Sequence, residues 1–210
     1  MANTTPTGKK PILGLIGGIG SGKSFVARLL AQRGGYVIEA DRLGHEALRQ
    51  PHIRQRIVEH FGPQVLDAQG EIDRTQLAGL VFAKPDQRQV LEALVHPYIT
   101  QRIHEAIDRA QADPSTRFIV LDAALLVETG WHRLCDKILF VDAPSQLRQT
   151  RTQQSRGWSA EEWRLREANQ WPLDQKRTFA HAVLDNSGDE ENLRHQLQTL
   201  LADWINHEAA

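Results

Sequence analysis

The chain has 210 residues, 40% of them hydrophobic and 24% charged, which is the size and composition of one globular domain with a sizeable core. Its 25 lysines and arginines nearly balance its 26 aspartates and glutamates, so net charge gives no indication of a polyanionic partner. A single cysteine, Cys135, excludes an internal disulfide, and the nine histidines form no zinc-binding pattern.

No apolar run approaches the roughly 20 residues of a membrane-spanning helix. The N-terminal MANTTPTGKK also lacks the apolar core of a secretory signal. We therefore expect a cytoplasmic protein with no membrane, nucleic-acid or protein partner, acting on a small molecule.

The first predicted elements are a strand, a helix and a second strand. PILGLIGG is typical of a short buried strand, Lys23 to Arg33 of a helix that ends at a glycine pair, and Tyr36 to Glu39 of another strand. Residues 42–112 then have the apolar spacing of several helices, the longest of which we expect Pro97 to interrupt. This block resembles a helical insertion rather than another layer of a sheet.

Three later apolar runs are typical of parallel strands covered on both faces: Arg117 to Leu126, Asp136 to Ala143 and His181 to Gly188. A closing amphipathic helix is expected from Glu190 to Ile205. Strands that alternate with helices predict an α/β fold with a doubly wound parallel sheet of about five strands. Within one domain, residues 1–210, we expect a nucleotide-binding core of residues 11–41, 113–150 and 172–206.

The segment GGIGSGKS connects the first strand to the first helix and matches the phosphate-loop pattern GxxxxGK[ST]. Glycines allow successive N–H groups to converge on phosphate oxygens, and the helix N-terminus adds its dipole. Lys23 would reach the β- and γ-phosphates, and the Ser24 hydroxyl would bind Mg²⁺. Nucleotide contacts are expected at Gly18, Ile19, Gly20, Ser21, Gly22, Lys23, Ser24 and Phe25. A glycine-rich turn without a ligand is the alternative.

A P-loop occurs in several classes of protein. A guanine-nucleotide switch would need an NKxD segment, which is absent, and VLDAQG (residues 65–70) is more typical of a turn than of a DxxG strand because Gly62 and Pro63 precede it. A motor or regulatory ATPase would show paired acids after a strand, whereas Asp122 is followed by two alanines. A small-molecule kinase needs an acceptor-side base and a mobile cationic cover, which the remaining segments supply.

Segments spread from about Ile12 to Leu197 resemble the dephospho-CoA kinase family in order and spacing: GLIGGIGSGKS, VIEADRLGHEAL, GEIDRTQLAGLVF, LEALVHP, VLDAALLVETG, REANQWPLDQKR and HAVLDNSG. The resemblance implies a P-loop kinase that uses ATP and Mg²⁺ to phosphorylate the ribose 3′-hydroxyl of dephospho-CoA. Two alternatives stay open. One is a P-loop kinase for another hydroxyl acceptor, such as a nucleoside or sugar acid, and the other is a nucleotide-binding regulatory module without transferase activity.

The resemblance also implies roles on the acceptor side, where residues 42–112 would bind the acceptor. Asp41 would orient or deprotonate the acceptor hydroxyl, with a helix N-cap as its other role. His45, one helical turn on, would contact the acceptor or be a structural histidine. Asp122 would contact Mg²⁺ through water or the acceptor, or cap a loop. Arg74 and His96 would also bind the acceptor, although an ordinary surface arginine and a helix-end histidine explain them as well.

By the same resemblance, residues 151–171 form a lid, and Arg151 and Arg156 would neutralise charge on the transferring phosphoryl group. Arg166, in the same segment, would bind substrate. Asn186 would contact adenine through its backbone or belong to a simple turn.

Four residues depart from the family pattern: Ile16, Phe25, Glu39 and Ala124. Phe25 replaces a hydroxyl residue that commonly contacts the α-phosphate, so we expect weaker binding of ATP. The chemistry should survive because the loop lysine, Ser24 and Asp41 are all present.

Overall fold

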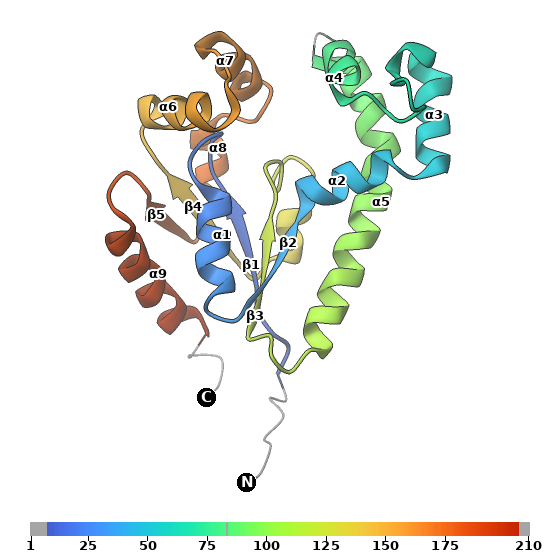
Figure 1. Ribbon diagram of the computed structural model, residues 1–210. Coiled ribbons are helices and arrows are strands. Elements are labelled where there is room, and N and C mark those ends of the chain that lie inside the picture. The colour runs from blue at the N-terminus through green and yellow to red at the C-terminus, as the bar shows by residue number, and fades with distance from the viewer. Residues whose placement is uncertain (1–7, 83, 206–210) are drawn as a thin grey trace. The chain divides into compact units, whose positions relative to one another are not determined.

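The computed structural model describes residues 8–82 and 84–205. Over these residues five strands form one parallel sheet in the order β2-β3-β1-β4-β5, which confirms the predicted α/β class (Figure 1). The strands are β1 (Ile12–Ile16), β2 (Gly35–Glu39), β3 (Phe118–Asp122), β4 (Lys137–Asp142) and β5 (Ala182–Asp185).

The helices belong to two compact units. The first unit ends at Glu39 and resumes at Ala106, and with the sheet it holds α1 (Lys23–Ala31), the 3₁₀ helix η2 (Trp131–Leu134), α6 (Ser145–Arg156), α7 (Ala160–Ala168), α8 (Leu173–Arg177) and α9 (Glu190–Ile205). The second unit, Ala40–Glu105, holds α2 (Ala40–Leu48), α3 (Pro51–Phe61), η1 (Pro63–Val65), α4 (Arg74–Phe82) and most of α5 (Pro85–Ala112). Across the described residues, no helix has both the length and the apolar character that a bilayer span needs.

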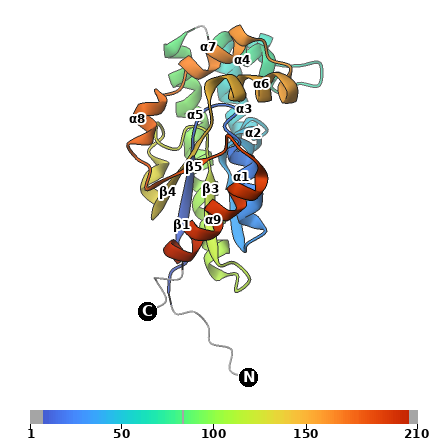
Figure 2. The same cartoon turned by 90° about the vertical axis from the view of Figure 1, so that its left-hand side faces the viewer.

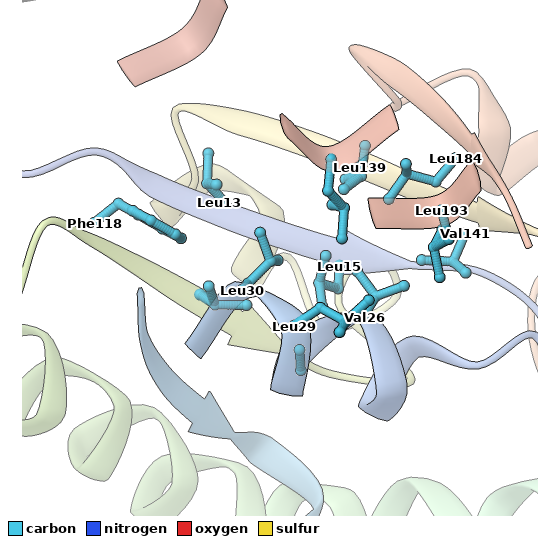
Figure 3. Packing of buried hydrophobic residues seen from close by; sticks show 13 residues of the cluster. Leu13, Leu15, Val26, Leu29, Leu30, Phe118, Leu139, Val141, Leu184 and Leu193 are labelled. Atoms are coloured by element: carbon cyan, nitrogen blue, oxygen red, sulfur yellow. The ribbon is translucent and has the colours of Figure 1, made fainter. Parts of the chain in front are cut away.

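One face of the sheet is covered by α1 and α9. Side chains alternate along a strand, so Leu13 and Leu15 of β1 point to the same face. There they pack in one cluster with apolar residues of both helices (Figure 3). The cluster comprises Leu13, Leu15, Val26, Ala27, Leu29, Leu30, Phe118, Val120, Leu139, Val141, Leu184, Leu193 and Leu197. Because β1 and α1 are both anchored in it, the glycine loop between them has two fixed ends.

The other face of β1 is covered by the segment that follows β3. A Cβ added at Gly14 would lie 2.7 Å from Leu126 Cδ2 and 2.8 Å from Cys135 Sγ, so these two side chains fill the space above the glycine. The predicted strand from Arg117 to Leu126 is therefore too long: β3 ends at Asp122, and residues 124–129 form turns. Leu126 is apolar because it packs onto the sheet from a turn, not because it belongs to a strand.

The chain leaves the sheet in opposite directions after β1 and β4. β1 leads to the edge strand β2, and β4 leads to the other edge strand, β5. Ligands of open α/β sheets bind where the direction reverses, at the carboxyl ends of the strands. Figures 1 and 2 show α6 and α7 beyond this end of β1 and β4. The glycine loop, which follows β1, therefore lies at the position expected for a ligand.

The second unit contains the turn that the sequence predicts at residues 65–70. Leu66 pairs with Ile72 in an isolated antiparallel bridge, and the carboxylate of Asp67 accepts the backbone N–H groups of Gln69 and Glu71 at 2.9 and 3.0 Å. A carboxylate that binds its own following backbone closes a tight turn. The superficial match of this segment to a guanine-nucleotide element is thus explained by turn chemistry.

Helix α5 corrects another expectation, because it continues through Pro97 without a break. Proline removes one backbone donor and crowds the preceding turn, which usually kinks or ends a helix. Here Pro97 is exposed, whereas Ile99 and Ile103 just beyond it are buried. Burial of the following turns stabilises the helix on both sides of the proline, since tertiary packing contributes most of helix stability.

Candidate functional site

The glycine loop joins β1 to α1 and begins one residue after Ile16. Gly17, Gly20 and Gly22 have φ values of 147°, 80° and 96°, a region that other residues rarely adopt. Helix α1 begins at Lys23, as the sequence predicts, and the Lys23 ammonium donates to the carbonyl oxygens of Gly17 and Gly18 at 3.1 and 3.3 Å. The loop thus has the curled backbone of a phosphate-binding loop, with its lysine folded over it.

Besides their φ values, the loop glycines are needed because side-chain and backbone atoms of other segments lie close to them. A Cβ at Gly18 would lie 2.3 Å from Arg148 Nη1, one at Gly20 2.3 Å from the Arg148 carbonyl oxygen, and one at Gly22 2.2 Å from Asn186 Nδ2. None of these distances is compatible with a side chain. Helix α6 and the residue after β5 therefore pack closely against the loop.

Arg148 is the centre of these contacts, and sequence analysis did not identify it. The residue is 5% exposed, its Nε donates to the Ala143 carbonyl at 3.1 Å, and its Nη1 donates to the Ile19 carbonyl at 3.3 Å. The same nitrogen forms an ion pair with Glu167 of α7, and the guanidinium lies 5.1 Å from the ring centroid of Trp163. In the sequence, only the spacing of three residues between Arg148 and Arg151 indicates that Arg148 shares a helical face with the predicted site residue Arg151.

Arg151 and Asn186, both predicted site residues, lie together beside the loop. Arg151 Nη2 donates to the Asn186 carbonyl at 3.0 Å, and Asn186 Nδ2 donates to the Ser21 carbonyl at 2.7 Å. Within the described chain Arg151 Nη1 is buried and has no hydrogen-bond partner. It lies 4.0 Å from the position of a Cβ on Gly22. A cationic donor is therefore held next to the loop.

Arg156 and Arg166, the other two predicted lid arginines, stack against one aromatic ring. Their Cζ atoms lie 4.9 and 4.1 Å from the ring centroid of Trp158. Such cation–π contacts contribute about 0.5–1 kcal/mol at exposed sites. Trp158 thus connects the end of α6 to α7 through two guanidinium groups.

Asp122 and Ser24, the two predicted metal ligands, lie at the end of β3 and at the start of α1. Asp122 is the last residue of β3 and pairs in register with Leu15 of β1 and Glu39 of β2. Ser24 is exposed in the first turn of α1. Parallel pairing brings the carboxylate-bearing end of β3 next to the end of β1 from which the loop starts.

In the second unit, Asp41 and His45 lie one turn apart on α2. Asp41 is the second residue of this helix and is exposed, so it lies inside the first turn rather than at the residue before the helix. Burial and the nearby Arg74 guanidinium lower the pKa of His45, against a smaller raising effect of Asp41. His45 is therefore mainly neutral near pH 7.

The remaining predicted acceptor ligands lie on two other helices of this unit. Arg74 is the first residue of α4, and the carboxylate of Asp73 before it caps the helix by accepting the N–H groups of Thr75 and Gln76 at 2.8 and 3.1 Å. His96 lies within α5, where burial lowers its pKa despite the carboxylate of Glu92. His96 is thus mid-helix and not at a helix end.

Comparison with known proteins identifies the family. The family model of dephospho-CoA kinases matches residues 11–192. The dephospho-CoA kinases of Geobacillus kaustophilus and Bacillus licheniformis are 38% and 39% identical to the chain, over 91% and 94% of its length and 96% and 98% of theirs. The chain belongs to the dephospho-CoA kinase family.

Two solved structures have the same fold. The chain in the crystal structure of TT1252 from Thermus thermophilus is 35% identical in sequence to this kinase, and the two superpose with a TM-score of 0.79. The match covers 94% of this kinase and 99% of TT1252. The dephospho-CoA kinase of Campylobacter jejuni is 22% identical in sequence and superposes with a TM-score of 0.68. This match covers 94% of the chain and 98% of the Campylobacter protein. The second comparison shows that the fold is shared at low identity.

A buried ion pair is a further feature that sequence analysis missed. Lys176 of α8 is 1% exposed, and its ammonium contacts Glu128 Oε1 at 2.8 Å, the Ala124 carbonyl at 2.9 Å and Gln170 Oε1 at 3.0 Å. Three acceptors match the three donors of an ammonium group. The pair joins the segment after Asp122 to the segment after α7.

The four departures from the family pattern have structural neighbours of their own. Ile16 is buried, Phe25 packs partly buried against the core cluster, and Glu39 pairs in register with Asp122. Ala124 contributes a carbonyl oxygen to Lys176. Ile16 and Phe25 thus contribute apolar surface to the packing of the kinase.

Proposed function

We propose that this kinase transfers the γ-phosphoryl group of ATP to the ribose 3′-hydroxyl of dephospho-CoA, and that it does so in the cytoplasm. Family membership makes the chain an ATP-dependent kinase of dephospho-CoA. The observation that carries the residue roles is the buried Nη1 of Arg151, an open cationic donor beside a curled phosphate loop. A guanidinium in such surroundings is suited to an anionic oxygen.

We assign the nucleotide to the loop and its neighbours. Lys23 binds the β- and γ-phosphates, and the loop from Gly18 to Ser24 surrounds them. Phe25 follows on α1, at the position where a hydroxyl would contact the α-phosphate. Asn186, after β5, completes the nucleotide site.

Ser24 and Asp122 fit a Mg²⁺ site. One hydroxyl and one carboxylate leave most coordination positions for phosphate oxygens and water, which is how Mg²⁺ binds in kinases. Bound Mg²⁺ would neutralise charge on the β- and γ-phosphates. Asp122 ends the strand next to β1, which leads into the loop that bears Ser24, so the register of the sheet supports the pairing.

The acceptor roles belong to the second unit. Asp41 accepts the proton of the 3′-hydroxyl as its bond to phosphorus forms. His45, on the same face of α2, is neutral because its pKa is lowered, so it can both donate and accept a hydrogen bond to the acceptor. Arg74 and His96 contribute further contacts to dephospho-CoA.

The cationic cover is formed by residues 151–171. Arg151 is already oriented by Asn186, whereas Arg156 and Arg166 stack on Trp158 in this structure. We assign the last two to contacts with phosphoryl oxygens and substrate that form when the segment closes. Closure would also exclude water from the transfer.

The test is a turnover assay with purified protein, Mg·ATP and dephospho-CoA, in which ADP and the 3′-phosphorylated product are identified by mass. Asp41→Asn serves as the variant without the base, and adenosine and gluconate serve as other acceptors. We expect product from dephospho-CoA alone and a loss of about 10²–10⁴-fold in Asp41→Asn, the usual contribution of a positioned base.

Other outcomes assign the chain differently. Turnover on adenosine or gluconate without turnover on dephospho-CoA would identify a P-loop kinase of another acceptor. Tight binding of ATP without turnover on any acceptor would favour a regulatory module. Full activity in Asp41→Asn would leave the reaction in place and remove Asp41 as the base.

A further inference from the structure

The side chain of Asn186 faces the phosphate loop. The residue is 6% exposed, and its Nδ2 donates to the Ser21 carbonyl at 2.7 Å in a buried hydrogen bond. The same nitrogen lies 2.2 Å from the position that a Cβ on Gly22 would take. The amide therefore occupies the space that the missing side chain of Gly22 leaves open.

The backbone of Asn186 is fixed independently of its side chain. Its N–H donates to the Asp142 carbonyl at 2.8 Å, and its carbonyl accepts Nη2 of Arg151 at 3.0 Å. One residue thus connects the end of β4, helix α6 and the loop. The amide reaches Ser21 from a rigid support.

The hydrogen bond to Ser21 controls the orientation of a loop peptide. Across the trans peptide between Ser21 and Gly22, the C=O and N–H groups point in opposite directions. Because Asn186 holds the Ser21 carbonyl toward itself, the Gly22 N–H is held on the side away from Asn186. A phosphate loop functions only if its N–H groups, and not its carbonyls, face the anion.

We propose that Asn186 is a positioning residue for the phosphate loop, which its side-chain amide keeps in the anion-binding conformation while its carbonyl aligns Arg151. This inference rests on the proposed nucleotide site and adds a mechanism to it. The side chain of Asn186 acts on the triphosphate and not on the base, because its amide is buried against the loop backbone. Loss of the amide therefore lowers the affinity for every ligand that carries a triphosphate, and by a similar factor.

The test compares the binding of three ligands to the 210-residue chain: ATP, GTP and inorganic tripolyphosphate, each with Mg²⁺. Their affinities are measured by displacement of a fluorescent ATP analogue. Asn186→Asp replaces the donor by an oxygen that repels the Ser21 carbonyl, and Asn186→Ser, an uncharged and shorter side chain, is the second variant in case the aspartate prevents folding. We expect both variants to raise the dissociation constants of all three ligands by about tenfold or more, as for a lost buried hydrogen bond.

Gln196 offers a matched control, because its side-chain amide binds Asp185, the residue before Asn186. Gln196 forms two amide hydrogen bonds with the backbone of Asp185, at 2.9 and 3.0 Å, without any described contact to the loop. Gln196→Glu makes the same amide-to-acid change and should leave the three affinities unchanged. Thermal melts without ligand show whether each variant is folded at the assay temperature.

Two results would overturn the inference. If Asn186→Ser lowered the affinity for ATP but not for tripolyphosphate, the Asn186 side chain would act on the base and not on the triphosphate. If neither variant changed any affinity, the hydrogen bond would be a simple turn contact. This test is independent of the proposed acceptor. A protein that binds triphosphates but does not phosphorylate dephospho-CoA would still show the same differences in triphosphate affinity between the variants.

Discussion

The ammonium of Lys176 lies 2.8 Å from the carboxylate of Glu128, with the lysine side chain 1% and the glutamate side chain 14% exposed. Glu128 Oε1 also accepts the backbone N–H of Trp171 at 3.1 Å. The segment between α7 and α8 is thus held to the turns that follow β3. No other contact described for these turns joins opposite charges in so buried a place.

Replacing Lys176 by Met should destabilise the kinase strongly, because the carboxylate of Glu128 would remain buried without its cation. Removing one partner of a buried pair costs about 3–5 kcal/mol of the free energy of unfolding. Urea denaturation followed by tryptophan fluorescence would measure this loss. In the double variant Lys176→Met/Glu128→Leu we expect most of the stability to return, since an apolar pair of similar volume is often neutral. A double variant no more stable than the single one would contradict the explanation.

Gly22→Ala should abolish most nucleotide binding, because the new Cβ would lie 2.2 Å from Asn186 Nδ2 at a φ of 96°. We expect the dissociation constant for ATP to rise by more than about tenfold, the equivalent of ~1.4 kcal/mol. Gly70→Ala is the matched control, since its φ is 75° but no atom lies within 4 Å of the added Cβ. Equal effects of the two substitutions on ATP binding would contradict this explanation, because Gly70 lies outside the loop.

Phe25→Thr should lower the KM for ATP, because it supplies the hydroxyl that the loop lacks. It should also lower the melting temperature, since Phe25 packs against the core cluster and lies 5.4 Å from the Arg28 guanidinium. Phe25→Val has the same branched shape without the hydroxyl, so it should lose stability without improving KM. If Phe25→Thr left KM unchanged, the missing hydroxyl would have no role in ATP binding.

Cys135 should be unreactive in the folded protein. Burial, with a smaller effect of Asp136, raises the pKa of its thiol to about 12 from 9.0, and its Sγ lies against Gly14 of β1. The thiolate fraction near pH 8 is then lower by about three orders of magnitude, and the thiolate is the reactive form. A disulfide exchange reagent should modify Cys135 only after unfolding in guanidinium. Rapid stoichiometric modification of the native protein would contradict this.

Stability should decrease as the pH falls below about 6.5. Burial lowers the pKa of His96 below the ordinary histidine value of about 6.5, so the unfolded chain binds this proton more readily than the folded chain. The contribution of His96 is therefore complete above pH 6.5 and is lost as the pH falls through the lowered value. Urea titrations at pH 7 and pH 5 should show a smaller stability difference in His96→Gln than in the unaltered protein. The difference should not vanish, because the pKa of His45 is shifted in the same direction.

Local patterns predicted the parts of the site that are continuous in sequence. The loop, the start of α1 at Lys23 and the final helix Glu190–Ile205 follow from glycine spacing and apolar periodicity, which act over a few residues. The end of β3 was less predictable. The apolar residues after Asp122 pack on the sheet from turns, and buried turns and buried strands have the same composition.

Contacts between distant segments carried no local signal. Arg148 and Glu167 are 19 residues apart, and Asn186 and Ser21 are 165 apart. Neither pair follows the periodicity of a single helix or strand. The role of Asn186 beside the loop thus became visible only once β5 was placed next to β4 in the sheet.

The spacing of contacts along α6 has a consequence for insertions and deletions. Arg148, Arg151 and Thr152, which lie near the loop or near Asn186, are at positions i, i+3 and i+4 and so share one face of the helix. One residue added or removed between Ser145 and Arg148 would turn that face by roughly 100° and withdraw all three side chains together. Length variation in this kinase should therefore be rejected between Ser145 and Arg148.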